Sequence, residues 1–248
     1  MLTEERHSMI IKAVNERSSV TIAELAEMLD VSASTVKRDL IILANEGKII
    51  KVRGGAMSRN ESFTSVEKNV EEKASICTEE KMTIAKYAAE LIENGDFVFL
   101  DAGTTTEKMI DYLNVKDVTF VTNGFIHAKK LARKGYKVFI TGGEIKASTE
   151  AIVGAECILT LKNYNFTKCF MGTNGISLTA GFTTPDVNEA RVKSAAIESS
   201  REVYVLADHS KFDEVSSATF AGLGKAVIIT DRIPNRKYNN AADITEVG

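Results

Sequence analysis

Residues 97–106 combine an apolar run with a polar turn that could bind an anion. Phe97-Val98-Phe99-Leu100 is typical of a strand buried on both faces of a sheet. The turn that follows contains Asp101, Gly103, Thr104, Thr105 and Thr106, and it is expected to lead into a helix. Glycine lets the backbone approach a ligand closely, and hydroxyl and amide groups at a helix N-terminus can hold a phosphate. The same residues are also common in turns and helix caps, so the pattern alone leaves both interpretations open.

Four more polar turns follow predicted strands further along the chain. They are Thr122-Asn123-Gly124, Thr141-Gly142-Gly143-Glu144, Gly172-Thr173-Asn174-Gly175-Ile176 and Asp208-His209-Ser210-Lys211-Phe212. Each could be a plain turn, but in such sheets ligands bind outside the carboxyl ends of the strands. Together the five turns would form a rim suited to a polyol phosphate.

Lys193 and Lys211 could supply the countercharge to such a phosphate. Each has a simpler alternative. Glu189 and Lys193 are four residues apart on a predicted helix and could form a surface ion pair. Lys211 could be a solvated loop residue.

The elements that would position these turns alternate between strand and helix after Glu79. Strands are predicted at 97–100, 118–121, 137–140, 168–171, 203–206 and 226–229, and helices at 105–113, 125–133 and about 185–201. Pro185 suits the first turn of the last helix. This alternation predicts an α/β fold with a mostly parallel sheet and helices on both faces.

The composition is that of a globular protein with two domains. The chain has 248 residues, of which 44% are hydrophobic and 26% charged. No apolar run approaches the ~20 residues of a membrane span, and the N-terminus does not resemble a signal sequence, so we expect a cytoplasmic protein with no membrane partner. Its three cysteines and three histidines are scattered, which predicts neither a disulfide framework nor a metal site, and no cofactor is expected.

A basic segment lies between Ser32 and Asn60, although the whole chain has a net charge of −3. Six basic residues, Lys37, Arg38, Lys48, Lys51, Arg53 and Arg59, accompany only Asp39 and Glu46. Such a local excess is typical of a surface that faces DNA.

Three short helices are predicted between Thr3 and Gly47. The first is capped by Thr3, and the second begins at a capping box of Thr21 and Glu24. The third is capped by Ser32 and ends at Gly47. Two short helices joined by a tight turn predict a helix-turn-helix, whose second helix enters the major groove.

Polar residues of the third helix could reach bases and phosphates. They are Ser34, Thr35, Lys37 and Arg38, which lie off the apolar stripe of this helix. The alternation from 48 to 56, with its glycine pair, predicts a β-ribbon, or wing, whose Lys51 and Arg53 would contact the phosphate backbone. A solvated charged face is the alternative for each of these charges.

Segments 20–26, 31–40 and 54–56 strongly resemble the N-terminal domain of DeoR-family transcriptional repressors. The family usually has a second arginine where Lys37 stands and a histidine where Arg53 stands. Both departures keep a polar donor, so DNA binding is expected and the operator sequence stays open. The residues expected to contact DNA are Thr21, Ser32, Ser34, Thr35, Lys37, Arg38, Lys51 and Arg53.

The rest of the chain resembles the effector domain of the same family, which is related in fold to ribose-5-phosphate isomerase and coenzyme A transferases. By this resemblance a sugar phosphate would be held by Asp101, Gly103, Thr104, Thr105, Thr106, Asn123, Gly142, Gly143, Asn174, Glu189, Lys193 and Lys211. Because a carboxylate would repel the phosphate, we expect Asp101 at a sugar hydroxyl and the phosphate at 103–106. The family frequently has Asp in place of Asn174, and an amide cannot act as a base.

Segments 172–176 and 181–186 look most like those of fructose-operon repressors that respond to fructose 1-phosphate. A related set of repressors responds to tagatose phosphates. These ligands differ from fructose phosphates in the stereochemistry of one hydroxyl group, so the sequence leaves both open.

These observations predict a winged helix-turn-helix domain at 1–57, a linker at 58–78 and a sugar-phosphate effector domain at 79–248. The expected function is a transcriptional repressor that binds double-stranded operator DNA and is released by a phosphorylated sugar. The linker is expected to carry the change, and the family implies a homodimer or homotetramer. One alternative is a sugar-phosphate isomerase with an accessory DNA-binding module and Glu189 as base. Another is a DNA-binding protein without small-molecule input.

Overall fold

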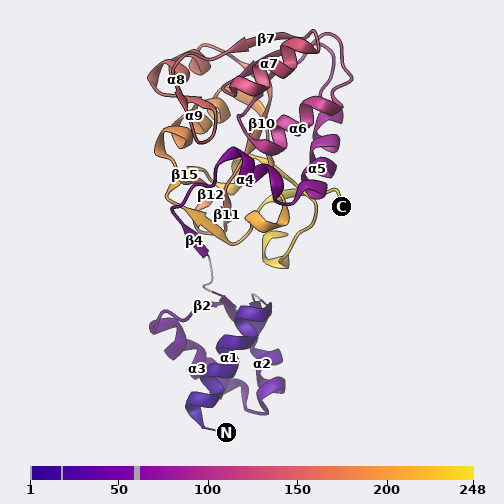
Figure 1. The fold of residues 1–248 in the computed structure, drawn as a ribbon. Coiled ribbons are helices and arrows are strands. Elements are labelled where there is room, and N and C mark those ends of the chain that lie inside the picture. Colours follow the sequence, from indigo (N-terminus) through magenta and orange to yellow (C-terminus); the bar gives the residue numbers. More distant parts are fainter. Residues whose placement is uncertain (1, 18, 59–61) are drawn as a thin grey trace. The chain divides into compact units, whose positions relative to one another are not determined.

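The computed structural model describes residues 2–17, 19–58 and 62–248, and Arg59 of the basic segment lies outside them. The chain divides into two compact units (Figure 1). The first comprises residues 1–61, and the second begins at Ser62 and includes the rest of the chain apart from the short stretch 235–237.

Three helices form the N-terminal unit, namely α1 (Thr3–Arg17), α2 (Ile22–Leu29) and α3 (Ala33–Asn45). Strands β1 (Ser19–Thr21), β2 (Ile49–Val52) and β3 (Gly55–Ser58) form an antiparallel sheet in the order β1-β3-β2. The apolar stripe of α3, which includes Val36, Leu40 and Leu43, packs into one core with residues of α1 and α2. The predicted winged helix-turn-helix is therefore confirmed.

The glycine pair of the wing is required by its geometry. Gly54 lies in the turn between β2 and β3 with a φ of +94°, which favours glycine. A Cβ atom on Gly55 would lie 2.3 Å from the backbone oxygen of Val20, because β3 runs between β1 and β2.

A seven-stranded sheet organises the C-terminal unit. Its strands, in spatial order, are β17 (Asp243–Glu246), β16 (Val227–Thr230), β13 (Ser200–Leu206), β10 (Phe166–Gly172), β5 (Phe97–Leu100), β6 (Thr119–Thr122) and β7 (Lys137–Ile140). Every neighbouring pair is parallel. The α/β fold class is confirmed, and of these strands only β17 was not predicted.

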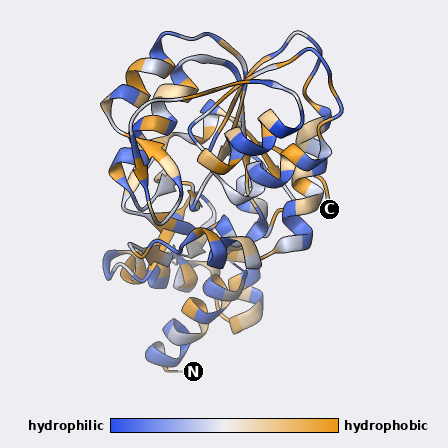
Figure 2. Ribbon diagram, turned by 45° about the horizontal axis from the view of Figure 1, so that its top comes forward, coloured by the Kyte–Doolittle hydropathy of each residue, from blue (hydrophilic) through white to orange (hydrophobic). Residues whose placement is uncertain are grey.

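Helices cover both faces of this sheet. Helices α5 (Thr78–Glu90), α6 (Thr104–Tyr112) and α7 (Phe125–Arg133) share a core with Val98 and Leu100, whereas α8 (Ala155–Lys162) and α9 (Val187–Glu198) share one with Phe99. Figure 1 shows α8 and α9 on one side of β10 and α5 and α6 on the other. Figure 2 shows helices of the unit banded in hydrophilic and hydrophobic colours, as expected when one face is buried. Helix α9 is capped by Asp186, so Pro185 precedes the helix instead of lying in its first turn.

Smaller β-structures surround the carboxyl end of the sheet. They are the hairpin β8 (Glu144–Lys146) with β9 (Ala151–Val153), the sheet of β11 (Gly175–Ser177), β12 (Gly181–Thr184) and β15 (Ala218–Ala221), and the pair β4 (Ser62–Thr64) with β14 (Glu214–Ser216). None of the helices among the described residues is long and apolar enough to cross a membrane.

The stretch predicted as a linker, 58–78, is structured in its described part. Strand β4 pairs in parallel with β14, and α4 (Val70–Ser75) follows, capped by Asn69. Residues 62–78 thus belong to the C-terminal unit, because their backbone and charged groups have partners there.

Candidate functional site

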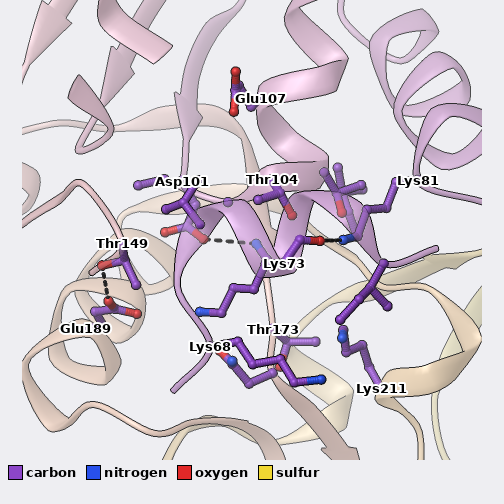
Figure 3. Close-up of a pocket in the computed structure, with 18 of the residues that line it drawn as sticks. Lys68, Lys73, Lys81, Asp101, Thr104, Glu107, Thr149, Thr173, Glu189 and Lys211 are labelled. Atoms are coloured by element: carbon purple, nitrogen blue, oxygen red, sulfur yellow. Dashed lines mark hydrogen bonds between the residues drawn. The ribbon is translucent and has the colours of Figure 1, made fainter. Parts of the chain in front are cut away.

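A cavity of about 380 Å³ lies at the carboxyl ends of β5, β10 and β13. The turns after these three strands contribute Asp101, Gly103, Thr104 and Thr105, then Gly172, Thr173 and Asn174, then Asp208, Ser210 and Lys211. Figure 3 shows Asp101, Thr104, Thr173 and Lys211 around it. Three of the five predicted polar turns therefore meet, as expected of a parallel sheet.

The N-terminus of α6 forms part of the cavity wall. Gly103 is its N-cap residue, and Thr104 and Thr105 follow in the first turn, where backbone N–H groups lack a helical acceptor. The hydroxyl of Thr106 points inward instead. It donates to the backbone oxygen of Asp101 at 2.6 Å and accepts from the Gly103 N–H at 3.0 Å. Thr106 is fully buried and shapes the turn without lining the cavity.

Asp101 and Lys193 form a buried ion pair. The Lys193 ammonium donates to Asp101 Oδ2 at 2.5 Å and to the Gly172 carbonyl oxygen at 3.0 Å. The Gly172 N–H donates to the same Oδ2 at 3.0 Å. Lys193 is therefore already neutralised, and its charge is only partly available to a phosphate.

Glu189 lies on the same helix as Lys193 but has other partners. Its Oε1 accepts from the Thr149 hydroxyl at 2.7 Å and from Lys146 Nζ at 3.2 Å. The alternative of a surface pair between Glu189 and Lys193 is wrong, because both side chains are buried and turn to different partners.

Lys81 of α5 is a cavity residue that the sequence analysis missed. It is only 3% exposed, and its ammonium donates to the backbone oxygen of Lys73. No carboxylate lies within ion-pair distance of Lys81 among the residues the structure describes. Burial lowers the pKa of Lys81, and the charge of Asp208 opposes this effect.

Asp208 and Lys211 lie on the same side of the cavity. Burial alone would raise the pKa of the Asp208 carboxyl, but Lys211, Ser210 and Lys81 together hold it below its usual value. Within the described chain its Oδ2 is buried without a hydrogen-bond partner. An ionised carboxylate and two ammonium groups are thus available to a ligand that carries both hydroxyl and anionic groups.

Three further predicted effector residues do not line the cavity. The Asn123 amide accepts from the Ala102 N–H at 3.1 Å and donates to the Ile152 carbonyl at 3.2 Å, so it supports the turn after β5. Gly142 and Gly143 follow β7, which is one of the two edge strands of the sheet and lies four positions from β13. Gly143 has a φ of +131° and lies against the backbone oxygen of Val153, which accounts for a glycine there.

Other lining residues were also missed, notably Lys68, Lys73, His127, Thr149 and Asp208. His127 is buried, and burial lowers the pKa of its imidazole. Only Asp208 could have been found by a local signal, because it begins a turn that had been singled out.

The predicted DNA-contact residues fall into two groups. The hydroxyls of Thr21 and Ser32 accept from the N–H groups of Glu24 and Thr35, each at 3.2 Å, so both residues cap helices. The other six are Ser34, Thr35, Lys37 and Arg38 on α3, Lys51 on β2 and Arg53 in the wing turn. Of these six, only Thr35 is partly buried, and the others are exposed.

One group of possible metal ligands occurs among the described residues. Ligand atoms of Glu80, His209 and Asp231 lie within 4.8 Å of one another. Asp231 already accepts from the His209 ring at 2.8 Å and from its backbone N–H at 2.7 Å. These contacts account for the proximity of His209 and Asp231 as a hydrogen-bonded pair.

A winged helix-turn-helix followed by an α/β unit with a polar cavity defines a transcriptional regulator with a sensor domain. Residues 6–62 match the DeoR-like helix-turn-helix domain, and residues 76–232 match the DeoR C-terminal sensor domain. The chain belongs to the DeoR family.

Relatives of similar length are also transcriptional regulators. The regulator FruR of Bacillus subtilis is 42% identical over 248 residues, which cover 100% of this chain and 98% of the relative. The lactose phosphotransferase system repressor of Staphylococcus aureus is 36% identical over 251 residues, which cover 100% and 99%.

Solved structures resemble parts of the chain at low identity. Ribose 5-phosphate isomerase A of Neisseria gonorrhoeae matches with a TM-score of 0.40 and 17% identity, over 55% of this chain and 53% of the isomerase. The sorbitol operon regulator SorC of Klebsiella pneumoniae matches with a TM-score of 0.38 and 11% identity, over 76% and 84%.

Proposed function

We propose that this chain represses a sugar-utilisation operon and releases its operator when a phosphorylated sugar binds the cavity. The observation that carries the proposal is the cavity itself. It combines the N-terminus of α6 with two ammonium groups, Lys81 and Lys211, that have no carboxylate within ion-pair distance among the described residues. The relatives include lactose phosphotransferase system repressors, which supports the same function.

The phosphate would bind at Thr104 and Thr105, with Lys81 and Lys211 as countercharges. A helix N-terminus attracts anions through its free N–H groups and its dipole. The sugar hydroxyls would be held by Asp101 Oδ1, Asn174 and Asp208. Asp101 Oδ2 is occupied by Lys193 and Gly172, so only its second oxygen would face the sugar.

Fructose 1-phosphate is the proposed effector. Residues 172–176 and 181–186 support it through their resemblance to fructose-operon repressors. Operator DNA would be bound by α3 and the wing. A palindromic operator requires at least a dimer, which we propose as the active form.

The test is operator binding measured against a panel of sugars. The operator is first selected from a random duplex library, and fluorescence anisotropy is then recorded with fructose 1-phosphate, fructose 6-phosphate, tagatose phosphates and free fructose. We expect a phosphorylated sugar to release the DNA and free fructose to have no effect. If millimolar concentrations of every sugar phosphate left operator affinity unchanged, the effector function would be refuted.

The DNA-contact residues have a separate test. Arg38→Ala should cost about 1–3 kcal/mol in operator affinity and relax specificity. Lys51→Ala should weaken binding to operator and unrelated DNA alike. It should also reduce the slope of log affinity against log salt concentration by about one, because one phosphate contact is lost. Unchanged operator affinity in Arg38→Ala would contradict the placement of α3 in the groove.

An isomerase would behave differently in solution. Conversion of ribose 5-phosphate, fructose 1-phosphate or fructose 6-phosphate by the pure protein, abolished in Glu189→Ala, would contradict the proposal of a regulator without catalysis.

A further inference from the structure

Segment 62–76, here called the strap, forms one wall of the cavity. It comprises β4, α4 and the residues between and after them, and six of its side chains line the cavity, namely Thr64, Val66, Lys68, Val70, Lys73 and Ile76. Figure 3 draws Lys68 and Lys73 together with Thr104, Thr173 and Lys211. Residues from before the α/β sheet therefore face the same space as the turns at its carboxyl end.

Polar contacts hold the strap in place. None of its residues is buried, and the side chains of Phe63 and Val66 are 67% and 75% exposed. Apart from the pairing of β4 with β14, its partners are charged or polar. Little apolar packing opposes its movement, as expected of a segment at the low-stability end of a fold.

Glu67 is the main anchor of the strap. It forms an ion pair with Lys146, which also contacts Asp186 at 2.9 Å, and a second pair, internal to the strap, with Lys73 at 3.2 Å. The Val70 N–H donates to the Ser148 carbonyl oxygen at 3.1 Å.

Three lysines link the strap to the anion-binding part of the cavity. Lys68 is exposed, and none of the described carboxylates lies within ion-pair distance of it. Lys73 supplies a second ammonium group and, through its backbone oxygen, accepts the hydrogen bond of buried Lys81. An anion beside Lys81 would stabilise its buried charge far better than a single carbonyl oxygen does.

We propose that the strap is part of the effector site, and that Lys68 and Lys73 bind the phosphate of the sugar together with Lys81. When the phosphate binds, the Lys81 ammonium donates to it instead of to the Lys73 carbonyl oxygen, and Lys68 and Lys73 move toward the N-terminus of α6. This inference rests on the proposed function and adds residues that sequence reasoning had placed in a linker.

A regulatory consequence follows from the order of the chain. Only residues 59–61 separate the strap from wing strand β3, which ends at Ser58. Effector binding thus acts on the segment that is covalently continuous with the wing. Coupling is reciprocal, so operator binding weakens the hold of the strap on the effector.

The test compares the full-length chain with three charge-matched variants, Lys68→Ala, Lys73→Ala and the control Lys86→Ala. Lys86 is exposed on α5 and does not line the cavity. Binding is measured by calorimetry with the sugar phosphate of the panel that wild type binds most tightly, beginning with fructose 1-phosphate. Each strap variant is expected to bind on the order of tenfold more weakly, because a cation beside a phosphate dianion is lost. The control should stay within about twofold of wild type.

A second measurement reads the strap directly. Amide hydrogen exchange of the full-length chain should slow in peptides covering 62–76 when the sugar phosphate is added, and the effect should shrink in Lys68→Ala. If wild type binds a sugar phosphate but both strap variants bind it equally well, the strap inference is overturned and the proposed function stands. If wild type binds none of the panel, the proposed function and the inference fall together.

Discussion

Asp39 should control how firmly α3 is held against α1. This residue is 3% exposed on α3, directly after Arg38. Its carboxylate accepts from Arg6 Nε at 2.5 Å and Nη2 at 3.0 Å, and lies 3.1 Å from His7 Nε2. Asp39→Asn keeps the size of the side chain and removes the charge that both partners on α1 approach.

The expected loss of stability can be estimated from burial and geometry. Removing one partner of a buried pair costs about 3–5 kcal/mol, because the other charge stays without compensation. The Arg6 side chain is 12% exposed and the amide introduced by the substitution can still accept one bond, so we expect the lower end, about 3 kcal/mol. Because 1.36 kcal/mol corresponds to a tenfold change in an equilibrium constant, this loss corresponds to a roughly 150-fold rise in the equilibrium constant for local opening.

Amide hydrogen exchange on the full-length chain measures this opening. Peptides from α1 and α3 should exchange roughly 150-fold faster in Asp39→Asn, and operator affinity should fall with them. The control is Glu27→Gln, which makes the same change at an exposed position of α2. A rise no larger than that of the control would refute the claim that the buried pair fixes α3.

Three further outcomes follow from the structure. The Arg6 hydrogen bonds lower the pKa of Asp39 in the folded protein. The stabilising effect of Asp39 should therefore persist above about pH 4 and be lost as the pH falls through the lowered pKa of the folded state. Circular dichroism should detect this loss of stability in wild type and not in Asp39→Asn. Gly55→Ala would place a Cβ 2.3 Å from a backbone oxygen of β1, and urea unfolding should report a loss of about 1–3 kcal/mol in the N-terminal unit. Burial raises the pKa of all three thiols, but Cys157 and Cys169 are buried whereas Cys77 is partly exposed, so a thiol reagent should label Cys77 alone in the native protein.

Local signals allowed most elements to be predicted. The capping box of Thr21 and Glu24 and the cap at Ser32 act within three residues, and both are present. The apolar run that became β5 could be recognised for the same reason, since a strand buried on both faces needs apolar residues at successive positions.

The order of strands in the sheet is not local, and this explains which site residues were misplaced. Along the chain the turns follow β5, β6, β7, β10 and β13 in that order, but in the sheet these strands lie in the order β13-β10-β5-β6-β7. The cavity forms around β10, so turns on its two neighbours join it. Asn123 lies one strand further out, and Gly142 and Gly143 two.

The strap was hidden for a different reason. Its composition is polar, like that of a linker. The charges that attach it lie on segments that are distant in the sequence, as shown by Lys146, which is 79 residues from Glu67. A segment held mainly by such pairs can be ordered by the fold and still released by a competing charge. A phosphate would compete for Lys81, whose hydrogen bond to the Lys73 carbonyl oxygen joins the strap to the cavity wall, and for the Lys73 ammonium, which pairs with Glu67 inside the strap. The features that made the strap resemble a linker are therefore those that would let it respond to an anionic effector.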